Sequence, residues 1–109
     1  MQFGRLPFTT TDWATVPQTE HRGESGMARW RTIEAGELRV RMVDYSPGYQ
    51  ANHWCSRGHV LLVLEGELIT ELQDGRVATL KAGTSYQVAN DVAPHRSRTE
   101  VGARLFIVD

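Results

Sequence analysis

The feature that most limits the fold of this sequence is a series of short segments in which apolar and polar residues alternate. Side chains alternate between the two faces of a β-strand, so the pattern indicates half-buried strands. Turn residues such as Ser46-Pro47-Gly48 and Asp74-Gly75 separate the segments. No window of about eleven residues carries apolar residues at helical spacing without glycine or proline. Strands at roughly ten-residue spacing are typical of an all-β sandwich or barrel.

The alternation predicts strands throughout the chain after residue 26. They cover residues 27–34, 37–45, 49–55, 59–65, 67–73, 76–80, 84–88, 95–99 and 103–108. Since 109 residues suffice for one small domain, we expect a single β-barrel spanning residues 27–109. Residues 1–26 are predicted to form an N-terminal arm. This arm is expected to pack on the barrel or on a partner subunit, because Phe3, Phe8 and Trp13 make it too apolar for a free tail.

Composition excludes several classes of partner. The chain has 12 basic and 13 acidic side chains and a formal charge of -1, which gives no electrostatic case for nucleic acid or an anionic membrane. Its longest apolar run, Val60 to Leu64, is too short to span a bilayer. A single cysteine cannot form an internal disulfide, and residues 1–5 lack the pattern of a signal peptide. We therefore expect a cytoplasmic protein.

Strand alternation also predicts which side chains point into the barrel. The first predicted hairpin places four arginines on one face, expected to be solvated or, alternatively, to form an anion-binding patch: Arg29, Arg31, Arg39 and Arg41. If His59 points inward, Leu61, Val63 and Glu65 follow it. Val60, Leu62 and Leu64 then form an apolar outer face, which must be covered by the N-terminal arm or by a second subunit. We expect a homodimer.

Three histidines and the only cysteine form the constellation most able to carry chemistry. His53 and Cys55 lie at i and i+2 on one predicted strand face, and His59 begins the next strand after a tight turn. His95 opens a later strand and can approach across the barrel. Imidazole and thiolate together suit borderline metals such as zinc. The alternative is that these histidines bind no metal and are hydrogen-bonded residues of the core. Cys55 could also be a redox-sensitive thiol or, with a neighbouring histidine, a nucleophile.

The stretch from Pro47 to Gly66 resembles the first motif of the cupin family. His53 matches the first histidine of its His-x-His pair, Cys55 stands in place of the second, and His59 stands in place of the glutamate. Gly66 lies at the expected distance from them. The segment from Gly83 to His95 is similar to the second cupin motif, with one additional residue and without the proline-glycine turn.

The His-Trp-Cys core further resembles a group of small single-domain cupins labelled by an Asp, His, Cys, Trp motif, in which Asn52 stands where the aspartate is expected. The resemblance implies a cupin-type antiparallel jelly-roll β-barrel with an interior metal site, here formed by His53, Cys55, His59 and His95. Three histidines and one thiolate favour zinc, with iron, nickel or copper as alternatives.

The sequence leaves the activity open. One hypothesis is a metalloenzyme of the dioxygenase, isomerase or lyase type that acts on a small polar or carboxylate-bearing molecule. The second is a non-catalytic protein that binds or senses a metal or a small molecule. The third is a metal-free barrel. No general base separate from the four candidate ligands can be identified, so no catalytic residue is assigned.

Overall fold

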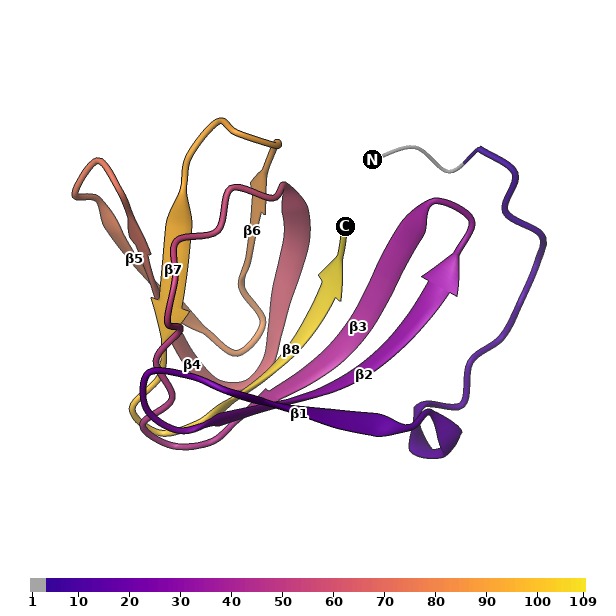
Figure 1. The fold of residues 1–109 in the computed structure, drawn as a ribbon, viewed down its shortest axis with the longest axis horizontal. Helices are drawn as coiled ribbons and strands as arrows, with labels where there is room; N and C mark the ends of the chain where they lie inside the picture. Colours follow the sequence, from indigo (N-terminus) through magenta and orange to yellow (C-terminus); the bar gives the residue numbers. More distant parts are fainter. Residues whose placement is uncertain (1–3) are drawn as a thin grey trace.

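The computed structural model describes residues 4–109; Phe3, expected above to pack on the barrel, lies outside them. The regular secondary structure of the described chain consists of antiparallel strands and one short helical turn (Figure 1). They are β1 (Gln18–Arg22), β2 (Met27–Ala35), β3 (Leu38–Tyr45), β4 (His59–Leu72), β5 (Val77–Lys81), β6 (Ser85–Val88), β7 (His95–Arg98) and β8 (Ala103–Val108). The helical element η1 (Trp13–Thr15) is a single 3-10 turn capped by Asp12. The all-β, antiparallel fold predicted from the alternation is confirmed.

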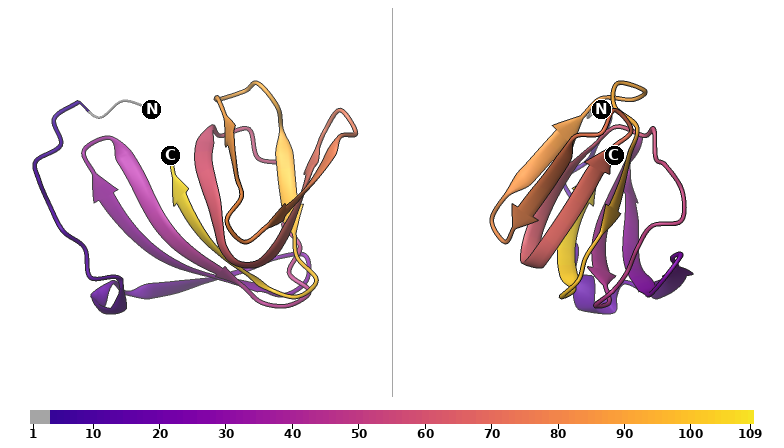
Figure 2. Two further views of the ribbon diagram at one scale, coloured as in Figure 1. Left: turned by 180° about the vertical axis from the view of Figure 1, so that it is seen from behind. Right: turned by 90° about the vertical axis from the view of Figure 1, so that its left-hand side faces the viewer.

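Strand β4 ties the two sheets of the barrel together. The strand order is β1-β2-β3-β8-β4-β5, and β6 and β7 also pair with β4. The first part of β4 pairs with β6 and β8, whereas its second part pairs with β5 and β7. Figures 1 and 2 show β4 bending between these two groups of strands. This sharing of one long strand curls the sheet around a common interior.

The bend in β4 corrects two details of the sequence prediction. The register against β8 shifts between Val63 and Glu65, and Gly66 follows with a positive φ of 78°. A side chain at Gly66 would collide with the backbone of Gly102, so only glycine fits this crossing. The bulge reverses the alternation, and Glu65 is therefore exposed rather than inward. Strand β4 also continues through Gly66, which was predicted to be a separator.

The predicted strand at residues 49–55 is absent. In this segment only Gln50 and Cys55 form isolated bridges, and the residues between them run as a loop along the barrel edge. The Cys55 amide donates to the His95 carbonyl at 2.7 Å, and the His95 amide donates to the Cys55 carbonyl at 3.0 Å. The loop is thereby anchored at β7, although it lacks a continuous ladder.

The arginine face of the first hairpin is the main error of the sequence analysis. Arg39 and Arg41 point into the barrel, and Arg41 is only 6% exposed. They share this inward face with Val43, a fully buried core residue. Val40 and Met42 lie on the outer face, and Arg29 and Arg31 lie there too, because Arg31 pairs with Met42. The four arginines therefore do not share one face. The prediction failed because it assumed that charged residues face water, whereas this end of the barrel has a polar interior.

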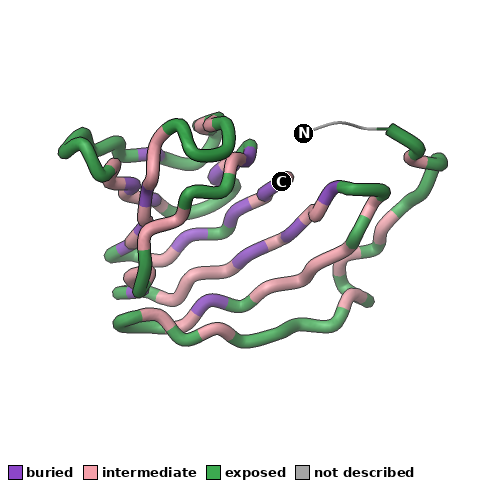
Figure 3. Tube along the Cα trace, turned by 45° about the horizontal axis from the view of Figure 1, so that its top comes forward, coloured by how far each residue is buried: buried purple, intermediate pink, exposed green. Residues whose placement is uncertain are grey.

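The hydrophobic core lies beside that polar end. It consists of Val43, Leu61, Val63, Leu68, Leu80, Ala103, Leu105 and Ile107. Figure 3 shows the buried stretches running along the middle strands of the sheet. Leu61 and Ile107 also line the cavity described below, so packed core and cavity are continuous. The closely packed core therefore forms a rigid support for the polar side chains that line the cavity.

The N-terminal segment is divided between the sheet and its outer face. Residues 18–22 of the predicted arm form β1, which pairs with β2. Trp13 packs edge-on against Phe106 with ring centroids 6.3 Å apart, whereas Phe8 is 95% exposed. Val60 and Leu64 on the outer face of β4 remain exposed. In residues 4–109, no helix has the length and apolar character needed to cross a membrane.

Candidate functional site

One cavity of about 340 Å³ opens at the end of the barrel where β4 begins. Its wall comes from β2, β3, β4, β6, β7, β8 and the 51–57 loop. The residues that line it are Trp30, Arg39, Arg41, Tyr45, Ala51, His53, Cys55, Arg57, His59, Leu61, Tyr86, His95, Arg96, Ser97, Ile107 and Asp109. All four predicted metal ligands are therefore brought to one cavity. A wider hollow of about 1060 Å³ shares the wall residues Arg57, His59 and Asp109.

His59 and His95 form the buried part of this wall. His59 is the first residue of β4 and His95 the first of β7, and both are buried. Their ring centroids lie 4.9 Å apart in an edge-to-face arrangement. His59 Nε2 and the Tyr86 hydroxyl are hydrogen-bonded at 2.7 Å. His95 Nδ1 donates to the carbonyl of Ala93 at 2.8 Å, which leaves a lone pair on His95 Nε2 when the ring is neutral.

Burial keeps His95 and Tyr86 uncharged. Desolvation lowers the pKa of His95, opposed by its hydrogen bond to the Ala93 carbonyl and assisted by the proximity of His59. Burial likewise raises the pKa of the Tyr86 phenol well above its ordinary value. Near neutral pH, His95 therefore offers an acceptor nitrogen rather than a positive charge.

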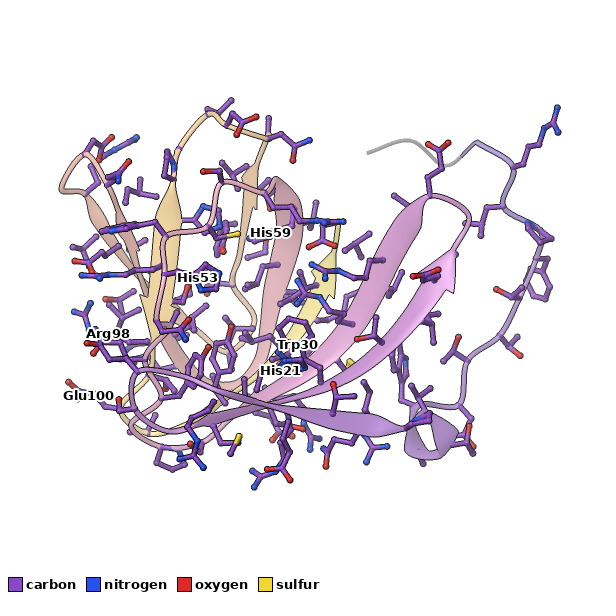
Figure 4. All side chains as sticks on the ribbon, viewed as in Figure 1. His21, Trp30, His53, His59, Arg98 and Glu100 are labelled. Carbon is purple, nitrogen blue, oxygen red and sulfur yellow. The ribbon has the colours of Figure 1, made fainter. Side chains whose placement is uncertain are left out.

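The other two predicted ligands lie nearer to solvent. His53 is exposed, and its Nδ1 donates to Asn52 Oδ1 at 2.7 Å. The Cys55 thiol is free and half-buried. Figure 4 labels His53 and His59 at the same side of the barrel, with Trp30 and His21 further toward β1 and β2. The ring of His21 stacks on Trp30 with centroids 3.8 Å apart and does not line the cavity.

A cluster of arginines surrounds Asp109 in the same cavity. Arg39 donates to both carboxylate oxygens, at 2.9 and 3.1 Å. Arg41 Nη2 donates to Oδ2 at 3.0 Å, and Arg57 Nε lies 3.4 Å from Oδ1. Burial by itself would raise the pKa of Asp109, but the nearby His59 ring, the hydrogen bonds from Arg39 and the charges of Arg41 and Arg39 hold it well below its usual range. Asp109 is therefore ionised, with its side chain only 1% exposed.

Three buried side-chain atoms lack a hydrogen-bond partner in the part of the chain that the structure describes. They are Arg41 Nε, His59 Nδ1 and His95 Nε2, and all three residues line this cavity. His59 Nδ1 lies 3.8 Å from Asp109 Oδ2, which is too long for a hydrogen bond. Unpaired buried polar groups are rare and costly, so their concentration in one cavity marks it as the candidate functional site.

The donor atoms in this cavity are of types that bind metal ions, but they are not spaced as the ligands of a single ion would be. The free nitrogens of His59 and His95 are of the kind that binds zinc or iron. Yet residues 4–109 contain no group of three or more histidine, cysteine, aspartate or glutamate side chains positioned to hold one ion. A ready-made metal centre is therefore not part of the described structure, and the four-ligand assignment stays a prediction.

Sequence reasoning missed Arg41 and Asp109. The spacing of Arg39, Arg41, Val43 and Tyr45 placed them on one face, and the apolar Val43 on that face was the available signal that the face is internal. Asp109 follows an apolar strand and lies outside the motifs recognised in the sequence, so nothing in the sequence marked it as a site residue. Its position is set by β8, which pairs with β3 and brings Asp109 opposite Arg39.

Comparison with known proteins identifies the fold. No protein-family model and no curated protein sequence matches the chain. Among solved structures, it is similar to a RmlC-like cupin from Shewanella frigidimarina, with 19% identity, a TM-score of 0.74, and coverage of 94% of this chain and 90% of that one. A hydroxypropylphosphonic acid epoxidase from S. wedmorenis is 20% identical, with a TM-score of 0.73 and coverage of 94% and 59%.

A third similar structure is Fe(II)-HppE with an alternative substrate. It is 18% identical, with a TM-score of 0.75, and the match covers 94% of this chain and 60% of that one. The chain thus spans about three fifths of the length of HppE and of the epoxidase. At these identities the similarity establishes the fold, which is that of a small cupin.

Proposed function

We propose that this protein binds a small polar molecule in the barrel cavity. The supporting observation is the convergence of three unpaired buried nitrogens on one cavity, because a bound molecule would satisfy groups that the protein itself leaves unsatisfied. Arg41 Nε offers a hydrogen-bond donor and His95 Nε2 an acceptor. A volume of about 340 Å³ suits a small ligand.

A panel of small polar molecules tests this proposal through thermal unfolding. The panel contains hydroxy acids, sugars, amino acids and nucleosides, and the variant is His95→Gln. His21→Gln is the matched control, since His21 is the histidine that does not line the cavity. The proposal expects at least one compound to raise the unfolding temperature of the parent protein and of His21→Gln, but not of His95→Gln. Absence of any stabilising compound, or equal stabilisation of His95→Gln, would contradict it.

The second candidate is a divalent transition metal held by His53, Cys55, His59 and His95, with zinc the first choice and iron, nickel or copper the alternatives. The free nitrogens of His59 and His95 support it. A bound metal would act as a Lewis acid toward a ligand in the cavity. In this case the protein would be a metalloenzyme of dioxygenase, isomerase or lyase type, or a metal sensor.

Equilibrium dialysis against zinc under reducing conditions, followed by elemental analysis, tests the metal. One zinc ion per chain is expected, lost in His59→Gln and in His95→Gln and retained in His21→Gln. Weaker binding by Cys55→Ser would support thiolate ligation, whereas unchanged affinity would remove Cys55 from the ligand set. A parent protein that binds no zinc would refute the metal proposal and leave the small-molecule proposal standing.

We further propose that the chain forms a homodimer in the cytoplasm. The exposed apolar side chains of Val60 and Leu64 on the outer face of β4 support pairing with a second copy. Light scattering coupled to gel filtration should give twice the mass of one chain, and the double variant Val60→Lys, Leu64→Lys should give the mass of one. A parent protein that elutes with the mass of a single chain would refute the dimer.

A further inference from the structure

The charges around the cavity do not balance. Asp109 is the one acidic residue among the residues that line it, and it is shared by Arg39, Arg41 and Arg57. A fourth lining arginine, Arg96, is already paired with a carboxylate outside the cavity wall, at 2.6 Å from Glu71 Oε1. Three guanidinium groups share one side-chain carboxylate, so the side chains that line this cavity carry more positive than negative charge.

Arg41 is the least solvated of these groups. Its side chain is only 8% exposed and lies over the ring of Trp30, with Cζ 4.5 Å from the ring centroid. Burial and the charge of Arg39 both lower the pKa of Arg41, in line with the small exposed fraction of its side chain. Its hydrogen bond to Asp109 uses Nη2, and Nε has no acceptor. A guanidinium buried with an unused donor is costly unless another acceptor completes its shell.

The other wall groups do not supply that acceptor. His59 Nδ1 and His95 Nε2 have no hydrogen-bond partner, so neither is paired with Arg41 Nε, and His59 Nε2 is hydrogen-bonded to the Tyr86 hydroxyl. His53 and Cys55 do not pair with Arg41 in the described structure either. The missing partner is therefore an acceptor with negative charge that comes from outside the chain. Guanidinium groups bind carboxylate and phosphate oxygens more strongly than neutral acceptors.

We propose that the cavity recognises the oxyanion group, carboxylate or phosphate, of a small molecule, and that Arg41 Nε–H is its central contact. The inference rests on the proposed function of the cavity as a ligand site, and it specifies the chemical class of that ligand. Arg39 and Arg57 add positive charge at the mouth, while Asp109 holds the three guanidinium groups in place. The volume of about 340 Å³ leaves room for a short organic acid or a small phosphate compound.

Isothermal titration with malonate, malonamide and inorganic phosphate tests the proposal. Malonate and malonamide have the same carbon skeleton and differ in charge. The parent protein should bind malonate at least about tenfold more tightly than malonamide, as expected for a charged hydrogen bond in a buried site. Tighter binding of phosphate than of malonate would identify phosphate as the preferred oxyanion.

Two variants and a control locate the binding site. Arg41→Gln should weaken malonate binding by about tenfold or more. Should that variant fail to fold, Arg57→Gln serves instead, because the Arg57 side chain is 52% exposed and can be replaced without disturbing the core. It should weaken binding about two- to fivefold. Arg104→Gln removes an exposed arginine that pairs with Asp44 outside the cavity and should change nothing.

Three results would overturn the proposal. Equal binding of malonamide and malonate would reject the oxyanion while leaving the cavity as a small-molecule site. Failure of both malonate and phosphate to bind at millimolar concentration would reject the oxyanion, and the panel measured on His95→Gln would then decide the proposed function by itself. Malonate binding that Arg41→Gln and Arg57→Gln leave unchanged would place any bound anion outside this cavity.

Discussion

Replacing Asp109 by asparagine should destabilise the fold strongly, although Asp109 lies at the edge of the barrel. Its carboxylate is 1% exposed and accepts hydrogen bonds from Arg39 and Arg41. Asparagine preserves the shape but removes the charge that holds the guanidinium groups together. Breaking a buried ion pair by removing one partner costs about 3–5 kcal/mol. For a chain of this size, a loss of about 3 kcal/mol lowers the unfolding temperature by about 12–20 °C.

Urea unfolding of Asp109→Asn at neutral pH gives the free energy of unfolding directly. The matched control is Asp74→Asn, which also removes a carboxylate from an arginine, Arg76, but at a site where both side chains are more than half exposed. We expect the control to lie within about 1 kcal/mol of the parent protein. If Asp109→Asn unfolds with the same free energy as Asp74→Asn, the arginine cluster does not stabilise the barrel, and the reasoning about its charges is wrong.

Three further predictions concern stability. The pKa of Asp109 is lowered in the folded protein, so its contribution to stability is complete above the unfolded-state pKa of about 4 and is lost as the pH falls from there toward the lower folded-state pKa. The free energy of unfolding by urea should therefore drop between about pH 4 and pH 2, and less steeply in Asp109→Asn. Leu105→Ala, at a fully buried position, should cost about 2–5 kcal/mol, whereas the exposed Val101→Ala should stay within about 0.5 kcal/mol in the same assay; similar losses would refute the core assignment. Gly66→Ala should cost at least about 1 kcal/mol because of its positive φ and its approach to the Gly102 backbone, and an unchanged unfolding temperature would refute the tight crossing of β4.

The sequence predicted the fold well because strand alternation is a local property. The segments that became β2, β3 and β5 to β8 were located within one or two residues, since each has its own apolar face and its own turn. Residues 49–55 failed because apolar and polar residues alternate there without a neighbouring strand that pairs with them continuously. Pairing is a tertiary property that alternation cannot reveal.

The candidate site was predicted only in part. His53, Cys55, His59 and His95 line one cavity, as their spacing and the cupin resemblance suggested. Their role as metal ligands is untested, since spacing along the chain does not fix distances between side chains. Arg41 was assigned to water because the residue type, and not the parity with Val43, decided the prediction.

The central claim is that the cavity around Arg41 binds the oxyanion group of a small molecule through the Nε–H donor that the protein leaves unpaired. The most direct measurement follows the side-chain Nε–H signals of the arginines in ¹H–¹⁵N correlation spectra during titration with malonate. The claim predicts that the Arg41 signal moves saturably, while that of Arg104, an exposed residue outside the cavity, stays in place. A stationary Arg41 signal, or parallel movement of both signals, would contradict it.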